Sequence, residues 1–256
     1  MPANLKKKDT GADVLELQRL LTTRGYPVDI DGEFGAKTFN AVRAFQTQHL
    51  DQHGQPLTID GAVGPITWWA LTHETPFIKT PSAVDYKTMP GKELGGSRIG
   101  RAALEVAISE LNAGACEIGG NNRGKWVKKY LTPGGMAEGN PWCASFVSWC
   151  FLRAGGDDKA KLPFAYSPGA RALLRLLEKK GWAHPPGSGY EPVPGDLVFW
   201  WRVRADGWQG HVGMVHQVQN GMIYTIEGNH SPKVQGFSYV LSRMEKLIGF
   251  GHIPDA

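Results

Sequence analysis

The stretch NPWCASFVSWC, residues 140–150, predicts a buried helix with a cysteine close to its start. Asn140 is a good N-cap residue and Pro141 a good first helical residue, so we expect Cys143 in the first turn. The helix dipole favours a thiolate there by only about 0.3–1 kcal/mol, and one pKa unit corresponds to about 1.4 kcal/mol. A thiol of ordinary pKa would therefore stay mostly protonated at neutral pH, and a reactive Cys143 requires a nearby imidazole as proton acceptor.

The best candidate for that imidazole is His211, which begins an alternating stretch, residues 210–218. This stretch follows another predicted strand at residues 195–200 and precedes a third at residues 222–227, so antiparallel strands are expected. Strand side chains alternate between faces, so Glu227 and Asn229 share one face.

The loop between the last two strands decides whether His211 shares that face. A three-residue loop, residues 219–221, would place His211 opposite Asn229 and Gly213 opposite Glu227, whereas a two-residue loop would turn them apart. We predict the three-residue loop, with Gly213 leaving room for Glu227 to reach the ring.

The remaining cysteines and histidines are predicted to be structural. Three cysteines at wide spacing, Cys116, Cys143 and Cys150, make neither a disulfide framework nor a zinc pattern, and Cys150 lies two turns after Cys143 on the buried face. His49 and His53 have the spacing of a metal pair but lack a third ligand, so surface positions are expected. For His216, which faces away from His211, we expect a satisfied or half-exposed side chain.

Residues 1–72 predict a small helical module. Apolar residues at helical spacing indicate helices around residues 14–21 and 39–45, and Pro65 is a suitable first residue for a third. The element DGEFGAKT, residues 31–38, returns as DGAVGPIT, residues 60–67, each time with glycines suited to a tight turn before a helix. Turn chemistry alone would explain the repeat; ligand contacts at Asp31 and Asp60 are the functional alternative.

Composition and charge narrow the class of protein. Residues 73–97 are rich in proline and glycine and read as a linker, which leaves residues 98–256 as a second domain. The net charge of +4 is too small and scattered for nucleic acid binding, although it suits weak attraction to an anionic polymer. The sequence contains no apolar run long enough to span a membrane, so membrane insertion is not expected. The N-terminus does not resemble a signal peptide.

The first module resembles the three-helix peptidoglycan-binding domain. The residues that carry the resemblance are Leu17-Gln18 with Leu20-Leu21, Gly25-Tyr26, the doubled D-G-x-x-G, Ala41-Val42 with Phe45-Gln46, and Thr67-Trp68-Trp69-Ala70-Leu71. The resemblance implies binding to the glycan or stem peptide of the bacterial wall without catalysis.

The second domain resembles the CHAP family of cysteine- and histidine-dependent amidohydrolases and peptidases. The resemblance is carried by the sequences PWCA at residues 141–144, PGDLVF at 194–199, GHVG at 210–213 and IEGN at 226–229. It implies an α+β, papain-like (NlpC/P60-like) fold, with Cys143 as nucleophile, His211 as base, Glu227 as its orienting carboxylate and Asn229 as a fourth member.

Departures from the family pattern also inform the prediction. The stretch before the nucleophile, residues 134–140, holds a single carboxylate, so no calcium site and no other metal or cofactor is expected. Trp142 stands where some members carry glutamine, and the backbone N–H of Cys143 is the best candidate oxyanion donor. Trp142 and Trp208 are candidates to line a substrate cleft, with core packing or a capping loop an equal alternative for Trp208.

Together the two resemblances imply a peptidoglycan hydrolase, either an N-acetylmuramoyl-L-alanine amidase or a stem or cross-link endopeptidase, acting as a monomer. Made in the cytoplasm without a signal peptide, it would reach the cell wall or periplasm through a holin, like an endolysin, or through a secretion system, with an immunity protein if it is a toxin. The alternatives are a non-catalytic wall-binding or virion structural protein with a vestigial site, and amide chemistry on a small metabolite such as a polyamine conjugate.

Overall fold

A computed structural model describes residues 4–53, 57–73, 82–91 and 95–255. By its internal contacts the chain divides into two compact units, one of Met1–Ser82 with the short segments Gln219–Met222 and Tyr239–Met244, and one of the remaining residues. Among the described residues no helix is long and apolar enough to cross a membrane.

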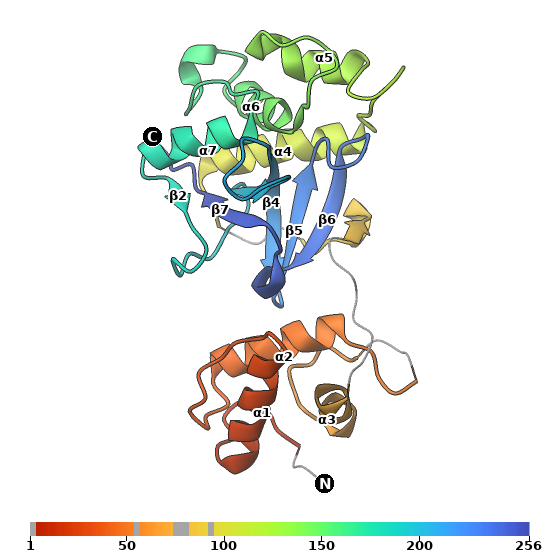
Figure 1. Ribbon diagram of the computed structural model, residues 1–256, viewed down its shortest axis with the longest axis vertical. Coiled ribbons are helices and arrows are strands. Elements are labelled where there is room, and N and C mark those ends of the chain that lie inside the picture. The colour runs from red at the N-terminus through yellow and green to blue at the C-terminus, as the bar shows by residue number, and fades with distance from the viewer. Residues whose placement is uncertain (1–3, 54–56, 74–81, 92–94, 256) are drawn as a thin grey trace. The chain divides into compact units, whose positions relative to one another are not determined.

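The N-terminal module contains the three predicted helices, α1 (Ala12–Thr23), α2 (Ala36–Gln48) and α3 (Pro65–Thr72), shown in Figure 1. Their apolar faces meet in a small core whose largest fully buried side chains include Leu17, Tyr26, Phe34, Phe45 and Leu71. The helical spacing in the sequence is thus explained by packing of the three helices against one another.

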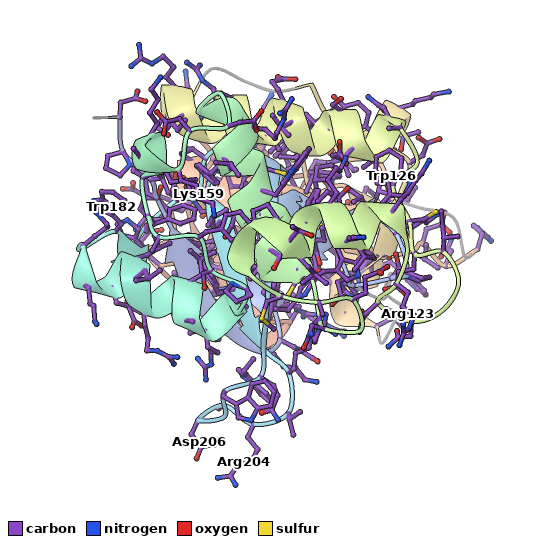
Figure 2. All side chains as sticks on the ribbon, turned by 90° about the horizontal axis from the view of Figure 1, so that it is seen from above. Arg123, Trp126, Lys159, Trp182, Arg204 and Asp206 are labelled. Atoms are coloured by element: carbon purple, nitrogen blue, oxygen red, sulfur yellow. The ribbon has the colours of Figure 1, made fainter. Side chains whose placement is uncertain are left out.

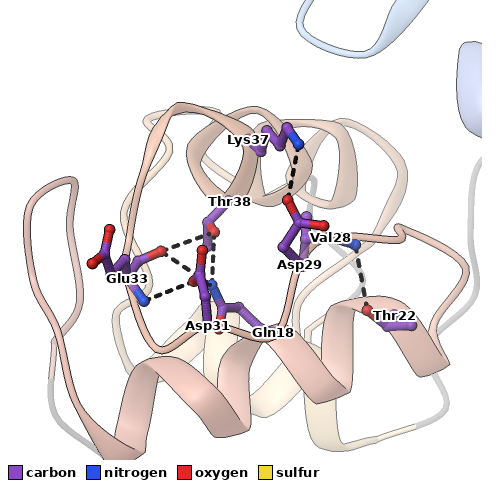
Figure 3. A network of polar contacts seen from close by, with 8 residues as sticks. All are labelled: Gln18, Thr22, Val28, Asp29, Asp31, Glu33, Lys37 and Thr38. Carbon is purple, nitrogen blue, oxygen red and sulfur yellow. Dashed lines mark hydrogen bonds and ion pairs between the residues drawn. The ribbon is translucent and has the colours of Figure 1, made fainter. Parts of the chain in front are cut away.

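A buried glutamine organises each copy of the repeat. Nε2 of Gln18 donates to Oδ1 of Asp31 at 2.7 Å, to the carbonyl of Glu33 at 3.0 Å and to Oγ1 of Thr38 at 3.1 Å (Figure 3). Its Oε1 accepts from the N–H of Gly32 at 2.8 Å. One side chain therefore satisfies four groups of the turn that precedes α2.

The second copy repeats this arrangement. Nε2 of Gln46 donates to Oδ1 of Asp60 at 2.9 Å, to the carbonyl of Ala62 at 2.8 Å and to Oγ1 of Thr67 at 3.3 Å, and its Oε1 accepts from Gly61 at 2.9 Å. Gln18 and Gln46 are part of the sequence resemblance, but only the structure shows that each belongs to the duplicated turn element that follows its helix.

Replacing either glutamine by leucine should destabilise this module. Gln18→Leu or Gln46→Leu leaves the buried N–H of Gly32 or Gly61 without its partner, and an unsatisfied buried group of this kind costs about 1–3 kcal/mol, so a loss of about that size is expected. Denaturant unfolding of the full chain measures it. The matched control is Gln52→Leu at an exposed glutamine, expected within about 0.5 kcal/mol of the parent; equal losses in the buried and exposed variants would refute this role.

The second unit places helices against an antiparallel sheet. Its α-helices are α4 (Arg98–Asn112), α5 (Lys125–Leu131), α6 (Cys143–Ala154) and α7 (Ala170–Lys179). Short 3₁₀ turns of this unit lie at Tyr86–Thr88, Thr132–Gly134 and Lys159–Lys161, and a further one, Leu241–Arg243, lies in a segment of the first unit. The predicted α+β class is confirmed.

The sheet has seven strands in the order β1-β6-β5-β4-β3-β7-β2. Its strands are β1 (Ser82–Val84), β2 (Ala183–His184), β3 (Leu197–Trp201), β4 (Gly210–Gln219), β5 (Met222–Glu227), β6 (Gln235–Val240) and β7 (Leu247–Gly251). The region read from sequence as a linker, residues 73–97, thus contains strand β1. The domain limits taken from the sequence stay a prediction.

Helix α6 lies between α5 and α4 in the helical part of this unit (Figure 1). Every residue from Cys143 to Leu152 is buried, and the shared core includes Phe146, Phe199 and Met214 from helix and sheet. Because the helix is buried all round, neighbouring elements hold its first turn, and with it Cys143, in a fixed position.

Candidate active site

Helix α6 begins at Cys143, two residues later than the capping pattern predicts. Asn140 is not the N-cap, because its side-chain amide donates to the carbonyl of Ala137 at 3.0 Å and Trp142 takes the N-cap position. The prediction of the start was therefore wrong in detail, while the placement of Cys143 in the first turn is correct.

A residue far along the chain holds the start of this helix. Oδ1 of Asn229 accepts from the N–H of Trp142 at 3.0 Å, and its Nδ2 donates to Oδ1 of Asn122 at 2.8 Å. Nε1 of Trp142 donates to Oε1 of Glu117 at 3.0 Å. In the structure Asn229 thus fixes the backbone directly before Cys143.

Trp142 lies inside the domain, with 1% of its surface exposed. Its ring packs against Tyr130 and Phe146 at centroid distances of 5.6 and 6.2 Å. A side chain so enclosed supports the helix start from within, which corrects its assignment as a residue that lines a cleft.

Cys143 and His211 are brought together, although sixty-eight positions separate them in the sequence. His211 lowers the pKa of the Cys143 thiol and Cys143 raises that of the imidazole, so the two side chains are neighbours; both residues are buried, with Cys143 keeping 6% of its surface exposed. Nε2 of His211 bonds to Oε2 of Glu227 at 2.7 Å, so Nδ1 is the nitrogen left for the thiol. The three groups form a continuous relay, sulfur to imidazole to carboxylate.

Gly213 makes room for the carboxylate. A Cβ at this glycine would lie 2.7 Å from Cγ of Glu227, so any larger residue would displace the side chain that reaches His211. Strand β3 supports the ring from the other side: Trp200 pairs with His211 in the sheet register, and the two rings lie 5.5 Å apart.

The turn between β4 and β5 differs from the prediction. Only Asn220 and Gly221 separate the strands, with φ of 55° and 74°, which is the geometry of a two-residue type I′ turn. His211, Gly213 and Glu227 nevertheless share one side, as predicted. A regular ladder from a two-residue turn would separate them, so their shared side requires an irregularity in the pairing between the turn and the site.

The relay sets the protonation states of its members. Burial acts to raise the pKa of the Cys143 thiol, but the hydrogen bond and charge of His211 outweigh it, and the pKa lies below its ordinary value. Burial acts to lower the pKa of His211, yet its bonds to Cys143 and Glu227 raise it to about 9. The pKa of Glu227 is lowered by the two histidines that it bonds, against the effect of its burial. These shifts favour a thiolate–imidazolium pair beside a charged carboxylate.

Several residues of this site were not identified from the sequence. Oγ1 of Thr225 donates to Oε1 of Glu227 at 2.6 Å, and His230 bonds Oε2 of the same carboxylate through Nδ1 at 2.8 Å. Glu117 and Asn122 anchor Asn229 from the segment between α4 and α5. The position of His230, three residues after Glu227, is a signal that could have been used, whereas Glu117 and Asn122 belong to no motif.

Trp208 lies in the loop between β3 and β4, shortly before His211, and 78% of its surface is exposed. Arg171 of α7 holds this loop by donating to the carbonyls of Gly207, at 3.0 Å, and Ala205. Figure 2 shows Arg204 and Asp206 of the same loop projecting away from the body of the domain. The loop thus presents an exposed aromatic ring beside the strand that carries the base.

Asp31 and Asp60 have structural partners in their turns. Oδ1 of each accepts from a glutamine and from a backbone N–H two residues later, at 2.9 Å to Glu33 and 2.9 Å to Ala62. Turn chemistry is therefore sufficient to account for both residues, and a contact with ligand stays a prediction.

The other histidines and cysteines lie outside the relay. His49 is buried and stacked on Phe45 at 4.0 Å, so the predicted surface position was wrong, because the aromatic face of α2 covers it. Nε2 of His216 bonds the carbonyl of Pro90 at 3.0 Å, which confirms a satisfied histidine. Cys150 is buried and burial raises its pKa, as a structural cysteine requires.

Such an arrangement can perform acyl transfer. A cysteine at a helix start supplies the nucleophile, an adjacent imidazole takes its proton, and a carboxylate holds the imidazolium. The N–H groups of the first turn of α6 are donors for a developing oxyanion.

Comparison with known proteins agrees with this site. Residues 135–229 match the family model described as "CHAP domain", a range that contains Cys143, His211, Glu227 and Asn229, and residues 10–71 match the model described as "Putative peptidoglycan binding domain".

Individual relatives match parts of the chain, and the chain in turn spans less than two thirds of the length of each of them. An uncharacterised protein in the bpoA1 3′ region of Kitasatospora aureofaciens is 39% identical over 79 residues, 30% of this chain and 62% of its own length. The structure of the Burkholderia AP3 phage endolysin is 31% identical over a match that spans 44% of this chain and 39% of the endolysin chain, with a TM-score of 0.24. The structure of Ly7917 with the hydrolyzing product of MDP is 14% identical, covers 60% and 62%, and has a TM-score of 0.40.

Proposed function

We propose that this chain, which carries a CHAP domain and a peptidoglycan-binding domain, is a peptidoglycan hydrolase that cleaves an amide bond of the bacterial cell wall. The observation that carries the proposal is the Cys143–His211–Glu227 relay inside the segment that matches the CHAP family. The wall-binding module supplies the class of substrate, because an anchored enzyme acts on the polymer that its anchor binds.

The relay accounts for each step of such a cleavage. The Cys143 thiolate attacks the amide carbonyl, and the oxyanion that forms is held by N–H groups at the start of α6. The His211 imidazolium gives its proton to the leaving amine, which breaks the C–N bond and leaves a thioester. His211 then takes a proton from water, whose oxygen displaces the thiol, while Glu227 stabilises the imidazolium in both halves of the reaction.

Two bond types suit this chemistry equally: the N-acetylmuramoyl-L-alanine amide, and an amide within the stem peptide or cross-link. Both present an amide carbonyl to the same nucleophile. The protein would act at the cell wall or in the periplasm as a monomer, reaching it through a holin or a secretion system.

Digestion of purified sacculi, followed by mass spectrometry of the released muropeptides, tests the function and identifies the bond. Free muramic acid carboxyl groups together with intact stem peptides mean amidase action, and shortened stems mean endopeptidase action. Sacculi that bind the protein but release nothing would indicate instead a wall-binding or virion structural protein with a vestigial site. Activity on soluble conjugates alone would point to small-metabolite chemistry.

We expect Trp208→Ala to weaken substrate binding without changing stability. The exposed ring has little packing to lose, and an aromatic contact with substrate is worth about 0.5–1.5 kcal/mol, or about 2- to 10-fold. The rate on dilute sacculi should fall by that factor and recover at saturating concentration. Asp206→Ala in the same loop is the control; if both variants behave like the parent enzyme, Trp208 has no substrate role.

A further inference from the structure

The Glu227 carboxylate is bound by a second histidine, one residue beyond the segment that matches the CHAP family. Its Oε2 accepts from Nε2 of His211 at 2.7 Å and from Nδ1 of His230 at 2.8 Å. Glu227 is completely buried, whereas the side chain of His230 keeps 27% of its surface exposed. His230 thus lies between the buried carboxylate and solvent.

The His230 ring is held in place by its neighbours. It stacks on Phe237 of β6 at 4.2 Å with an interplanar angle of 17°, and it meets the His211 ring edge-on at 5.3 Å and 74°. The chain returns to Glu227 because Asn229 adopts a left-handed conformation, with φ of 62°. An ionised carboxylate only accepts hydrogen bonds, so Nδ1 of His230 carries a proton directed at Oε2.

A bound metal is the other arrangement to weigh for these groups. Among the described residues, His211, Glu227 and His230 offer ligand atoms within 4.8 Å of one another. Ligands about 2.0–2.1 Å from a tetrahedral zinc would, however, lie about 3.4 Å apart. The N···O distances of 2.7 and 2.8 Å are hydrogen-bond lengths, and both nitrogens are directed at one oxygen. The geometry is that of a carboxylate held by two N–H donors.

We propose that His230 is a positioning residue of the relay, whose Nδ1–H keeps the Glu227 carboxylate ionised and directed at His211. It acts through Glu227 and does not touch the substrate. Testing this role by the rate of hydrolysis rests on the proposed function, whereas testing it by the pH at which the Cys143 thiol ionises does not.

The consequence is a defined dependence on pH. Glu227 faces Thr225, His211 and His230, and the thiolate of Cys143 feels the charges of His211 and Arg202. Removing the His230 donor makes Glu227 easier to protonate, because one of the bonds that lowers its pKa is lost. Protonated Glu227 no longer stabilises the imidazolium, so the thiolate should disappear at a higher pH than in the parent protein.

Alkylation of Cys143 by iodoacetamide as a function of pH measures this, with mass spectrometry to identify the modified cysteine. His230→Phe keeps a ring against Phe237 and removes the donor, whereas His230→Asn places an amide N–H near the position of Nδ1. A hydrogen bond to a charged group is worth about 1–2 pKa units, so the acid midpoint should rise by about one pH unit in His230→Phe and return in His230→Asn. The rate on saturating sacculi should fall about 10-fold or more in the first variant only.

Phe237→Leu, which removes the stacking partner but keeps the donor, should leave the acid midpoint in place. If His230→Phe does not fold, His230→Gln replaces it in the comparison with His230→Asn. The amide of the glutamine falls near the position of Nε2, so it does not replace the bond that Nδ1 donates to Glu227. An unmoved midpoint in His230→Phe, or in His230→Gln where that variant replaces it, overturns the proposal, as does His230→Asn behaving like either of them. If the parent protein leaves sacculi intact, the proposed function fails, while alkylation still decides the role of His230.

Discussion

Cys143→Ala should abolish cleavage of sacculi while binding to them persists. The nucleophile forms the covalent intermediate, and without it only oxyanion stabilisation and substrate binding remain, so the rate should fall by at least about 10³-fold. Alanine fits the site without strain, because the residue is small and the helix start is held by Asn229 through Trp142. Release of muropeptides, with co-sedimentation of the variant with sacculi, measures both halves of this expectation.

Cys116→Ala is the matched control, since it removes a thiol that lies outside the relay. It should retain the parent rate within about 2-fold. Cys143→Ser separates packing from chemistry: a hydroxyl of similar size is a much weaker nucleophile beside the same imidazole, so it should resemble alanine in rate. A Cys143→Ala protein that still releases muropeptides would place the nucleophile elsewhere.

The elements that the sequence predicts well are those with a strong period. The apolar spacing of α1 and α2, the alternation of β3 and β4 and the buried run of α6 each express one local rule, and the structure contains all of them. Local rules failed where a distant residue decides the geometry. The start of α6 is set by Asn229 of another segment and not by the capping sequence before it.

In the site, too, local sequence patterns identify some residues, whereas others are placed only by the fold. Cys143 and His211 stand in recognisable patterns, but Glu117 and Asn122 have no local signature, because their role comes from where the chain places them around Asn229. The repeat was visible as a turn sequence, yet Gln18 and its counterpart in α2 were not connected with it. The two glutamines precede the aspartates of their turns by 13 and 14 residues, and only packing brings them together.

The turn between β4 and β5 shows how a correct result can follow from an incorrect step. The alternation of side chains along the strands predicts a three-residue loop, whereas Asn220 and Gly221 form a two-residue turn. The requirement that His211 and Glu227 share a side was nonetheless right, since their side chains are bonded. The chemical requirement was thus a better guide than turn statistics, because an irregularity in the ladder can restore the parity.

Glu227→Gln should lower the rate at neutral pH by about 10²–10⁴-fold, the range expected when general acid–base catalysis is impaired. The carboxylate is part of what raises the pKa of His211 to about 9. With a neutral amide in its place that pKa falls, the imidazolium loses its partner, and the Cys143 proton returns to sulfur. The midpoint of alkylation at Cys143 should therefore move to higher pH, together with the acid limb of hydrolysis.

Glu227 should also make the stability of the folded protein depend on pH. The pKa of Glu227 is lower in the folded than in the unfolded chain, so its contribution to stability is present above the unfolded pKa of about 4.3 and is lost as pH falls toward the folded value. Glu227→Gln should remove this pH dependence, as thermal unfolding across that range would show. Glu110→Gln, at a buried carboxylate bonded to Lys129 and Tyr130, is the control for neutralising a buried charge outside the site. If it slows hydrolysis as much as Glu227→Gln while neither moves the alkylation midpoint, the carboxylate of the relay contributes to folding alone and not to the ionisation of the thiol.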